Sequence, residues 1–93
     1  MKLPAVYRNL TPRMRADVRK EYVRRQGGKC QFCGEPLSGP PSQDVVLAEI
    51  NEDLFPDGFF NHPVHLHHNH ETGLTIGAVH CRCNAVSFQY HGI

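Results

Sequence analysis

Histidines are concentrated in one short stretch of this chain, residues 65–70 (HLHHNH), which holds four of the seven in the sequence. Imidazole binds metal ions and moves protons near neutral pH, so this stretch suits both tasks. Adjacent side chains of a β-strand point to opposite faces, and we therefore expect His65 and His67 to have a different task from His68 and His70. The pattern predicts a site in which one face binds a metal and the other handles a proton. The alternative is an adventitious metal-binding tract, which the two residues that interrupt the histidines disfavour.

The four cysteines lie in two short motifs that flank the histidine stretch. Cys30-x-x-Cys33 is typical of half a zinc site, in which two thiolates hold a tetrahedral ion. Two completions are open: His80-x-x-Cys83 repeats the spacing of the first motif, whereas Cys81-x-Cys83 gives an all-thiolate site of softer ligands. Either set fills four positions, so the zinc is predicted to be structural. Disulfides or free thiols are the alternative.

A helix is predicted after an extended arm over residues 1–10. Thr11 is a good N-cap and Pro12 suits the first turn, while two glycines end the helix at about residue 25 or 26. Its apolar stripe, expected to face the core, consists of Met14, Val18 and Tyr22.

Two strands are predicted in the second half of the chain, at residues 64–68 and 74–79, followed by a short closing helix over residues 84–90. Residues 45–48 fit either a strand or a short helix. The aromatic turn at residues 55–60 is expected to cover a small core. These elements predict a small α+β fold.

Charge is separated along the chain. Before Cys30 there are nine basic residues and two acidic ones, whereas residues 35–57 carry six acidic residues and no Lys or Arg. A basic segment of this kind predicts a surface for a polyanion; an ordinary solvated helix is the alternative.

Ninety-three residues predict one small domain, whose core needs a staple such as zinc. We expect residues 1–29 to form the arm and basic helix, and residues 30–93 to form the zinc-stapled core. Since no apolar stretch has the length of a signal peptide or a membrane span, a cytoplasmic location without membrane contact is predicted.

Several of these motifs together resemble a known family. The Cys30-x-x-Cys33 pair, the stretch from residue 65 to the Thr72-Gly73 turn, Gly77 and the Cys83-Asn84 pair follow one another as in HNH endonucleases of the His-Me-finger (ββα-metal) superfamily. The chain is most similar to phage recombination endonucleases of the endonuclease VII type and to small phage HNH proteins, over about residues 28–86. The resemblance implies a ββα-metal core with a structural zinc, preceded here by the basic helix.

The resemblance also implies a role for each site residue. His68 is expected to be the general base that takes a proton from the attacking water, with His70 and His65 at the phosphate. His67 and Asn84 are expected to hold a catalytic divalent ion. The residues expected to contact DNA are Arg13, Arg15, Arg19, Lys20, Arg24, Arg25 and Arg82.

Two positions depart from the family pattern. His67 stands where the family has an acidic ligand, which predicts that Mn²⁺, Co²⁺ or Ni²⁺ is tolerated more readily than Mg²⁺ alone. Ile76 stands where the family often has an arginine, and Arg82 or the basic helix is expected to compensate.

The sequence therefore predicts a metal-dependent DNA endonuclease, phage- or prophage-encoded and active in the bacterial host cell. Its substrate would be duplex DNA, branched DNA or phage DNA near the packaging machinery, and it would work as a monomer or a homodimer. The competing hypotheses are a zinc-ribbon DNA-binding module with a degenerate active site and a metal-storage protein.

Overall fold

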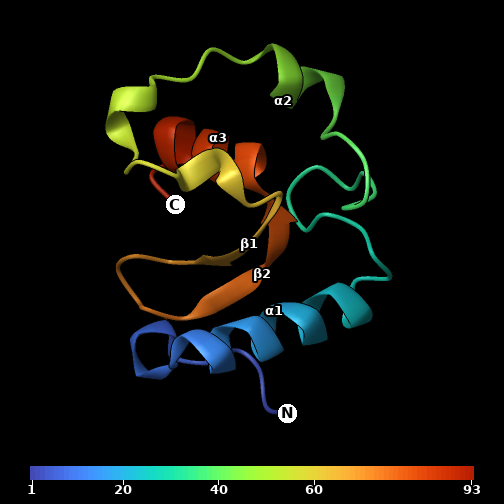
Figure 1. The fold of residues 1–93 in the computed structure, drawn as a ribbon, viewed down its shortest axis with the longest axis vertical. Helices are drawn as coiled ribbons and strands as arrows, with labels where there is room; N and C mark the ends of the chain where they lie inside the picture. Colours follow the sequence, from blue (N-terminus) through green and yellow to red (C-terminus); the bar gives the residue numbers. More distant parts are fainter.

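A β-hairpin lies between two helices in the computed structural model, which describes all of residues 1–93 (Figure 1). The elements, in chain order, are η1 (Tyr7–Asn9), α1 (Pro12–Arg25), α2 (Gln43–Leu47), η2 (Glu52–Leu54), η3 (Phe59–Asn61), β1 (Val64–His68), β2 (Thr75–His80) and α3 (Cys81–His91). Helix α1 lies along one side of the hairpin, and α3 lies on the other side with α2 beyond it. The predicted α+β class is confirmed. No helix is long and apolar enough to cross a membrane.

Helix α1 begins and ends as its sequence predicts. The Thr11 Oγ1 accepts a hydrogen bond from the Met14 backbone N–H at 3.2 Å, and the chain leaves the helix through Gly27 and Gly28, both with positive φ. The expected apolar stripe is only partly right. Val18 is buried, but Met14, in the first turn of the helix, is 46% exposed.

The two strands pair antiparallel, with Val64 opposite His80 at one end and His68 opposite Thr75 at the other. The register shifts between His67 and His68, so the regular alternation of the histidines breaks at that bond. Asn69 stabilises the connecting turn, because its Oδ1 accepts hydrogen bonds from the backbone N–H groups of Glu71 and Thr72.

Helix α3 starts three residues earlier than predicted, at Cys81 instead of Asn84, and follows β2 without a loop. Its first N–H, that of Cys81, donates to the Pro63 carbonyl at 2.9 Å, so the end of β2 and the start of α3 are fixed to the residue before β1. The helix ends at Gly92, which has a φ of 71°. Residues 45–48, for which strand and helix were both open, include the last turn of α2.

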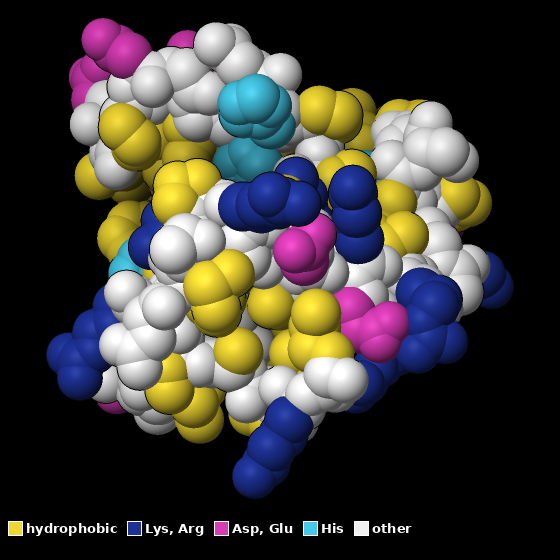
Figure 2. Space-filling view, turned by 60° about the horizontal axis from the view of Figure 1, so that its bottom comes forward, with side chains coloured by type: hydrophobic (Ala, Val, Ile, Leu, Met, Phe, Trp, Pro, Cys, Tyr) yellow, Lys and Arg dark blue, Asp and Glu magenta, His cyan; other side chains and the backbone are white.

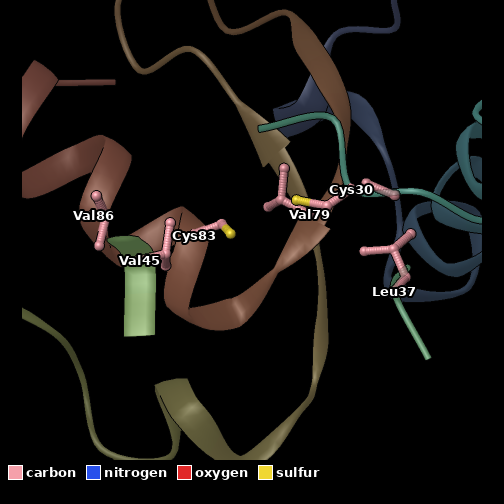
Figure 3. Close-up of a cluster of buried hydrophobic side chains, with 7 residues drawn as sticks. Cys30, Leu37, Val45, Val79, Cys83 and Val86 are labelled. Atoms are coloured by element: carbon pink, nitrogen blue, oxygen red, sulfur yellow. The ribbon is translucent and has the colours of Figure 1, made fainter. Parts of the chain in front are cut away.

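The core is small and is centred on the cysteines. It consists of Cys30, Leu37, Val45, Ala78, Val79, Cys83 and Val86 (Figure 3). Only 15 of the 93 residues are buried, so hydrophobic burial alone gives this chain a modest core. Arg82 adds a polar tie, since its guanidinium donates to the Val45 and Ala48 carbonyls at the end of α2.

The N-terminal arm is extended only in part, since a short 3-10 helix, η1, occupies Tyr7–Asn9 within the predicted extended segment 1–10. The arm docks on the far end of the hairpin. The Thr75 N–H donates to the Ala5 carbonyl and the Tyr7 N–H donates to the Gly73 carbonyl, at 2.9 and 2.8 Å. The Thr75 hydroxyl also contacts the Tyr22 hydroxyl of α1 at 2.8 Å. These bonds place Tyr7 beside the end of β1.

Candidate functional site

Three cysteines and one histidine converge at the junction of β2 and α3. The ligand atoms of Cys30, Cys33, His80 and Cys83 all lie within 4.8 Å of one another. Figure 3 shows the Cys30 and Cys83 side chains pointing toward each other across the core. Three sulfurs and one imidazole nitrogen match the tetrahedral donor set of structural zinc sites, so this cluster can hold a structural metal ion such as zinc.

The orientation of His80 fits a ligand role. Its Nε2 lies 2.9 Å from the Pro36 carbonyl, to which it donates, and its Nδ1 lies 3.5 Å from the Cys33 sulfur and 3.6 Å from the Cys83 sulfur. A backbone carbonyl on the outer nitrogen fixes the tautomer that leaves Nδ1 free to bind a metal. Of the two completions that the sequence left open, the structure brings His80 into the cluster and leaves Cys81 outside it.

Without a metal, the thiols of the cluster compete for protons. The hydrogen bond from Cys83 lowers the pKa of Cys30 to about 4, and the same bond, with burial, raises the pKa of Cys83. Burial alone raises the pKa of Cys81, which lies on α3 outside the cluster. A thiolate held among thiols is the state that a zinc ion stabilises.

Asn84, on the first turn of α3, links two histidines of β1. Its Oδ1 accepts from the His67 Nδ1 at 2.9 Å, and its Nδ2 donates to the His65 Nδ1 at 3.1 Å. His65 and His67 therefore share one face of β1, as the strand alternation predicts. Burial lowers the pKa of both imidazoles, which keeps them neutral near pH 7.

A cleft of about 750 Å³ opens beside this carboxamide. Its polar lining includes His65, His68, His70 and Asn84 from the hairpin and α3, together with Arg15 and Arg19 from α1. His67 is not part of the lining: it is 3% exposed and lies behind Asn84. No Asp or Glu lines the cleft, so the site is electrically suited to an anion.

The His68 imidazole belongs to a stack of side chains that the sequence did not reveal. The Tyr7 ring lies parallel to the His68 imidazole, with 3.7 Å between ring centroids, and the Arg15 guanidinium lies 4.0 Å from the Tyr7 centroid. Both groups sit too close to the Tyr7 ring to share one face, so Tyr7 is held between them. His70 is 4.7 Å from His68 on another side.

The charge state of His68 follows from this packing. Burial, with the nearby charges of His70, His67 and Arg15, lowers the pKa of His68 to about 4. The imidazole is thus neutral at pH 7 and has a nitrogen free to accept a proton. His68 lines the same cleft as His65, although simple strand alternation predicts opposite faces.

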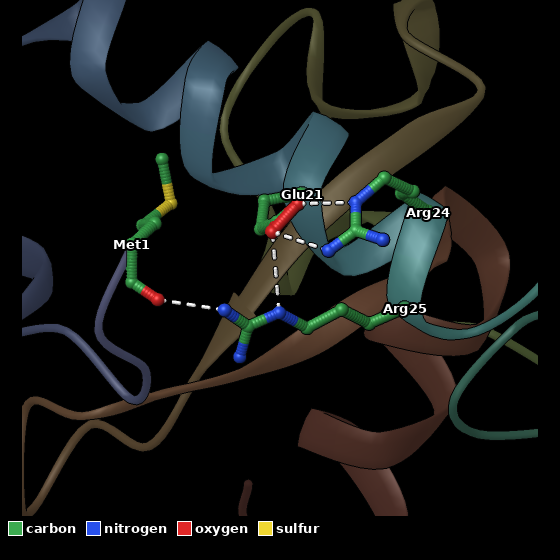
Figure 4. A network of polar contacts seen from close by, with 4 residues as sticks. All are labelled: Met1, Glu21, Arg24 and Arg25. Carbon is green, nitrogen blue, oxygen red and sulfur yellow. Dashed lines mark hydrogen bonds and ion pairs between the residues drawn. The ribbon is translucent and has the colours of Figure 1, made fainter.

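The arginines expected at a DNA surface separate into three groups. Arg15 and Arg19 line the cleft, and the buried Arg15 Nε has no hydrogen-bond partner in the protein. Arg24 and Arg25 both pair with Glu21, lowering the pKa of that carboxyl to about 2 (Figure 4). Arg82 donates from Nε and Nη2 to the Val45 and Ala48 carbonyls, and the DNA contact expected of it stays a prediction.

Figure 2 shows Lys and Arg side chains spread over one face of the molecule, with acidic side chains between them and histidines above. Arg13 and Lys20 are exposed on α1. The acidic residues of the segment 44–57 form no ion pair with this helix, since the two ion pairs of the structure both involve Glu21. The acidic segment therefore does not cover α1 through ion pairs.

Neither a family model, nor a curated protein, nor a solved structure matches this chain.

Two features of the site were missed by sequence reasoning, namely Tyr7 and the aromatic side of the cleft. The available signals were an aromatic residue in the arm, to which no role was assigned, and the Phe-rich segment 55–60, which was expected to cover the core.

Proposed function

We propose that this protein is a metal-dependent DNA endonuclease of the HNH type, with β1, β2 and α3 as its ββα-metal core. The observation that carries the proposal is the cleft in which neutral His68, His70, Asn84 and two α1 arginines meet without any carboxylate. A phosphodiester is an anion that needs a proton acceptor for the attacking water and cations around its oxygens. The cleft supplies both.

His68 would take the proton from water as the water attacks phosphorus. Its stack on Tyr7 fixes the ring plane, so a nitrogen is held in one direction without a change of rotamer. A pKa of about 4 makes the free imidazole a weak base, and the negative charge of a bound phosphate would raise that pKa toward the working range. His65 would contact the phosphate oxygens, and so would His70, whose ring centroid lies 4.7 Å from that of His68.

Arg15 would replace the phosphate clamp that Ile76 cannot provide. Its buried Nε lacks a partner, and a buried cationic donor left unpaired costs more than an ordinary hydrogen bond contributes. A phosphate oxygen entering the cleft would satisfy it, and Arg19 would stand beside it.

The residues that would hold the divalent ion are His67 and Asn84. The His67 Nδ1 now donates its proton to the Asn84 Oδ1 at 2.9 Å, so His67 would give up that proton on taking a metal. When bound, the ion would supply positive charge to the phosphate and the leaving oxygen. An imidazole and an amide oxygen are an intermediate donor set, which suits Mn²⁺, Co²⁺ or Ni²⁺.

A second function, DNA binding without cleavage, is favoured by one observation. His67 is 3% exposed, and its Nδ1 already donates a hydrogen bond to Asn84. Both features are also those of a histidine that only stabilises the fold. In that case the zinc cluster and the basic face of α1 would be the functional parts, and the histidines would pack the hairpin.

A plasmid-nicking assay separates the two functions. The purified protein is incubated with supercoiled plasmid, with and without Mn²⁺, beside a gel-shift assay on the same DNA. We expect open-circular product with Mn²⁺ only, and its absence from a His68→Ala variant that shifts DNA as wild type does. A shift without nicking under every divalent ion would select the binding module, and neither result would be compatible with a metal-storage protein.

A further inference from the structure

The side of the cleft that faces the arginines is aromatic. Phe55 and Phe59 are half-buried there, and Phe88 of α3 is 38% exposed. Phe88 meets Phe55 and His70 only in edge-to-face pairs, at 5.9 and 5.6 Å between centroids. Part of the Phe88 ring is therefore open to the cleft and not needed to fill the core.

This aromatic wall directly adjoins the candidate phosphate site. Phe59 lies 4.7 Å from His65, and Phe88 lies 5.6 Å from His70, so each of these two histidines has a phenylalanine as its immediate neighbour. A ligand whose anionic part contacts the histidines thus has aromatic surface within reach of its next group.

Charge limits what can occupy the aromatic end. Glu52, Asp53 and Asp57 are exposed on the segment that carries Phe55, and no Lys or Arg lies in that segment. These carboxylates repel a phosphate chain, whereas α1 on the opposite side attracts one. The wall consequently suits an uncharged planar group attached to a single phosphate held on the arginine side.

We propose that the aromatic wall is a nucleobase subsite, in which one unpaired base stacks on Phe88 and Phe55 while its phosphate lies against Arg15 and the histidines. The subsite rests on the proposed function, because it assumes that the anion is a nucleic-acid phosphate. A cleft of about 750 Å³ has the size of a small-ligand pocket, which fits one base with its phosphate and not a double helix. A base enters it only from a single-stranded or locally unpaired strand.

The test is a binding experiment that needs no cleavage. A short single-stranded oligonucleotide carrying one fluorescent adenine analogue, and the same strand in a duplex, are titrated with the protein without added divalent ion. Stacking on an aromatic ring quenches the analogue, so we expect quenching with the single strand. We also expect single-strand affinity to exceed duplex affinity.

Phe88→Leu is the diagnostic variant, and Phe32→Leu is its matched control. Both phenylalanines are 38% exposed, and Phe32 lies outside the cleft. Since base–aromatic stacking is worth roughly five- to a hundred-fold in affinity, Phe88→Leu should lose about that factor for the single strand and relieve the quenching. Its duplex affinity and its melting temperature should match those of Phe32→Leu, and Phe55→Leu serves as a second variant at the same wall.

Absence of quenching with wild type, or equal single-strand affinity in Phe88→Leu and Phe32→Leu, would overturn the subsite. The nuclease proposal is judged separately by plasmid nicking with Mn²⁺. Quenching without nicking rejects the nuclease and keeps the subsite as part of a single-strand binding protein. Nicking without quenching rejects the subsite and keeps the nuclease.

Discussion

The Tyr7 ring lies flat against the His68 imidazole, with 8° between the two planes and 3.7 Å between their centroids. Tyr7 reaches this position because the arm before it pairs with the far end of the hairpin, at Gly73 and Thr75. The orientation of the candidate base is thus set by a residue at the opposite end of the sequence.

Acid should destabilise the protein partly through His68. The pKa of His68 is about 4 in the folded protein, against an ordinary 6.5, so between these values the unfolded chain binds a proton that the folded chain does not. The contribution is fully present above pH 6.5 and declines as pH falls toward 4. In His68→Phe, whose ring can still stack on Tyr7, the free energy of unfolding from urea titrations should fall less steeply over this interval. Since both proteins lose zinc alike in acid, identical pH profiles would show that His68 is not the titrating group.

The choice of zinc ligands can be tested with two cysteine variants. Cys33→Ser removes one of the four clustered ligands, and we expect loss of zinc and of cooperative unfolding, because structural zinc contributes directly to folding free energy. Cys81→Ser, a change of the same chemistry on the neighbouring helix, should keep one zinc per chain and its melting temperature. Metal analysis and thermal melts measure both. Zinc retained in Cys33→Ser but lost in Cys81→Ser would contradict the observed geometry.

Removal of the proposed base should abolish nicking without altering the fold. His68→Ala should slow nicking by roughly 10²–10⁴-fold, the usual contribution of general base catalysis, with DNA affinity unchanged. His91→Ala, at an exposed position outside the cleft, is the control and should nick at the wild-type rate. Equal rates for the two variants would remove His68 from the mechanism.

The metal preference should follow the donor at position 67. His67→Asp replaces an imidazole by a carboxylate, a harder ligand, and should shift activity from Mn²⁺ toward Mg²⁺. His67→Ala and Asn84→Ala should both lose most activity and recover part of it in excess Mn²⁺. Nicking rates measured across a series of ion concentrations give the apparent metal affinity. An unchanged ion preference in an active His67→Asp would place the ion elsewhere.

The arginines of α1 should not be equivalent toward DNA. Arg19 lines the cleft, whereas Arg24 is paired with Glu21 and has a side chain 71% exposed. Arg19→Gln should reduce the slope of log affinity against log salt by about 0.9, the value of one phosphate contact, with little dependence on DNA sequence. Arg24→Gln should leave the slope nearly unchanged. Identical slopes for wild type and Arg19→Gln would mean that α1 does not touch the phosphates.

The features that were predictable from sequence depend on residues near one another in the chain. The structure confirms three such local patterns: the cap at Thr11, the two-residue spacing of the zinc motifs, and the strand over residues 64–68. Helix α3 was predicted to begin at Asn84, three residues too late, so its first turn was missed. In the structure the last ligand lies inside the helix.

The features that were missed depend on tertiary contacts. His65 and His68 were expected on opposite faces of β1, but both line the cleft, which runs past several residues of that strand. Arg82 was expected to be a surface cation, but its Nε and Nη2 donate hydrogen bonds to carbonyls at the end of α2. Likewise, the aromatic turn at residues 55–60 was expected to cover the core, whereas Phe55 and Phe59 line the cleft.

Asn84 directly follows a clustered cysteine, so the zinc cluster and the cleft share the first turn of α3. The turn that carries Cys83 into the cluster also carries the carboxamide that links His65 and His67. A metal ion held by the cluster would therefore fix the positions of two histidines that it does not touch.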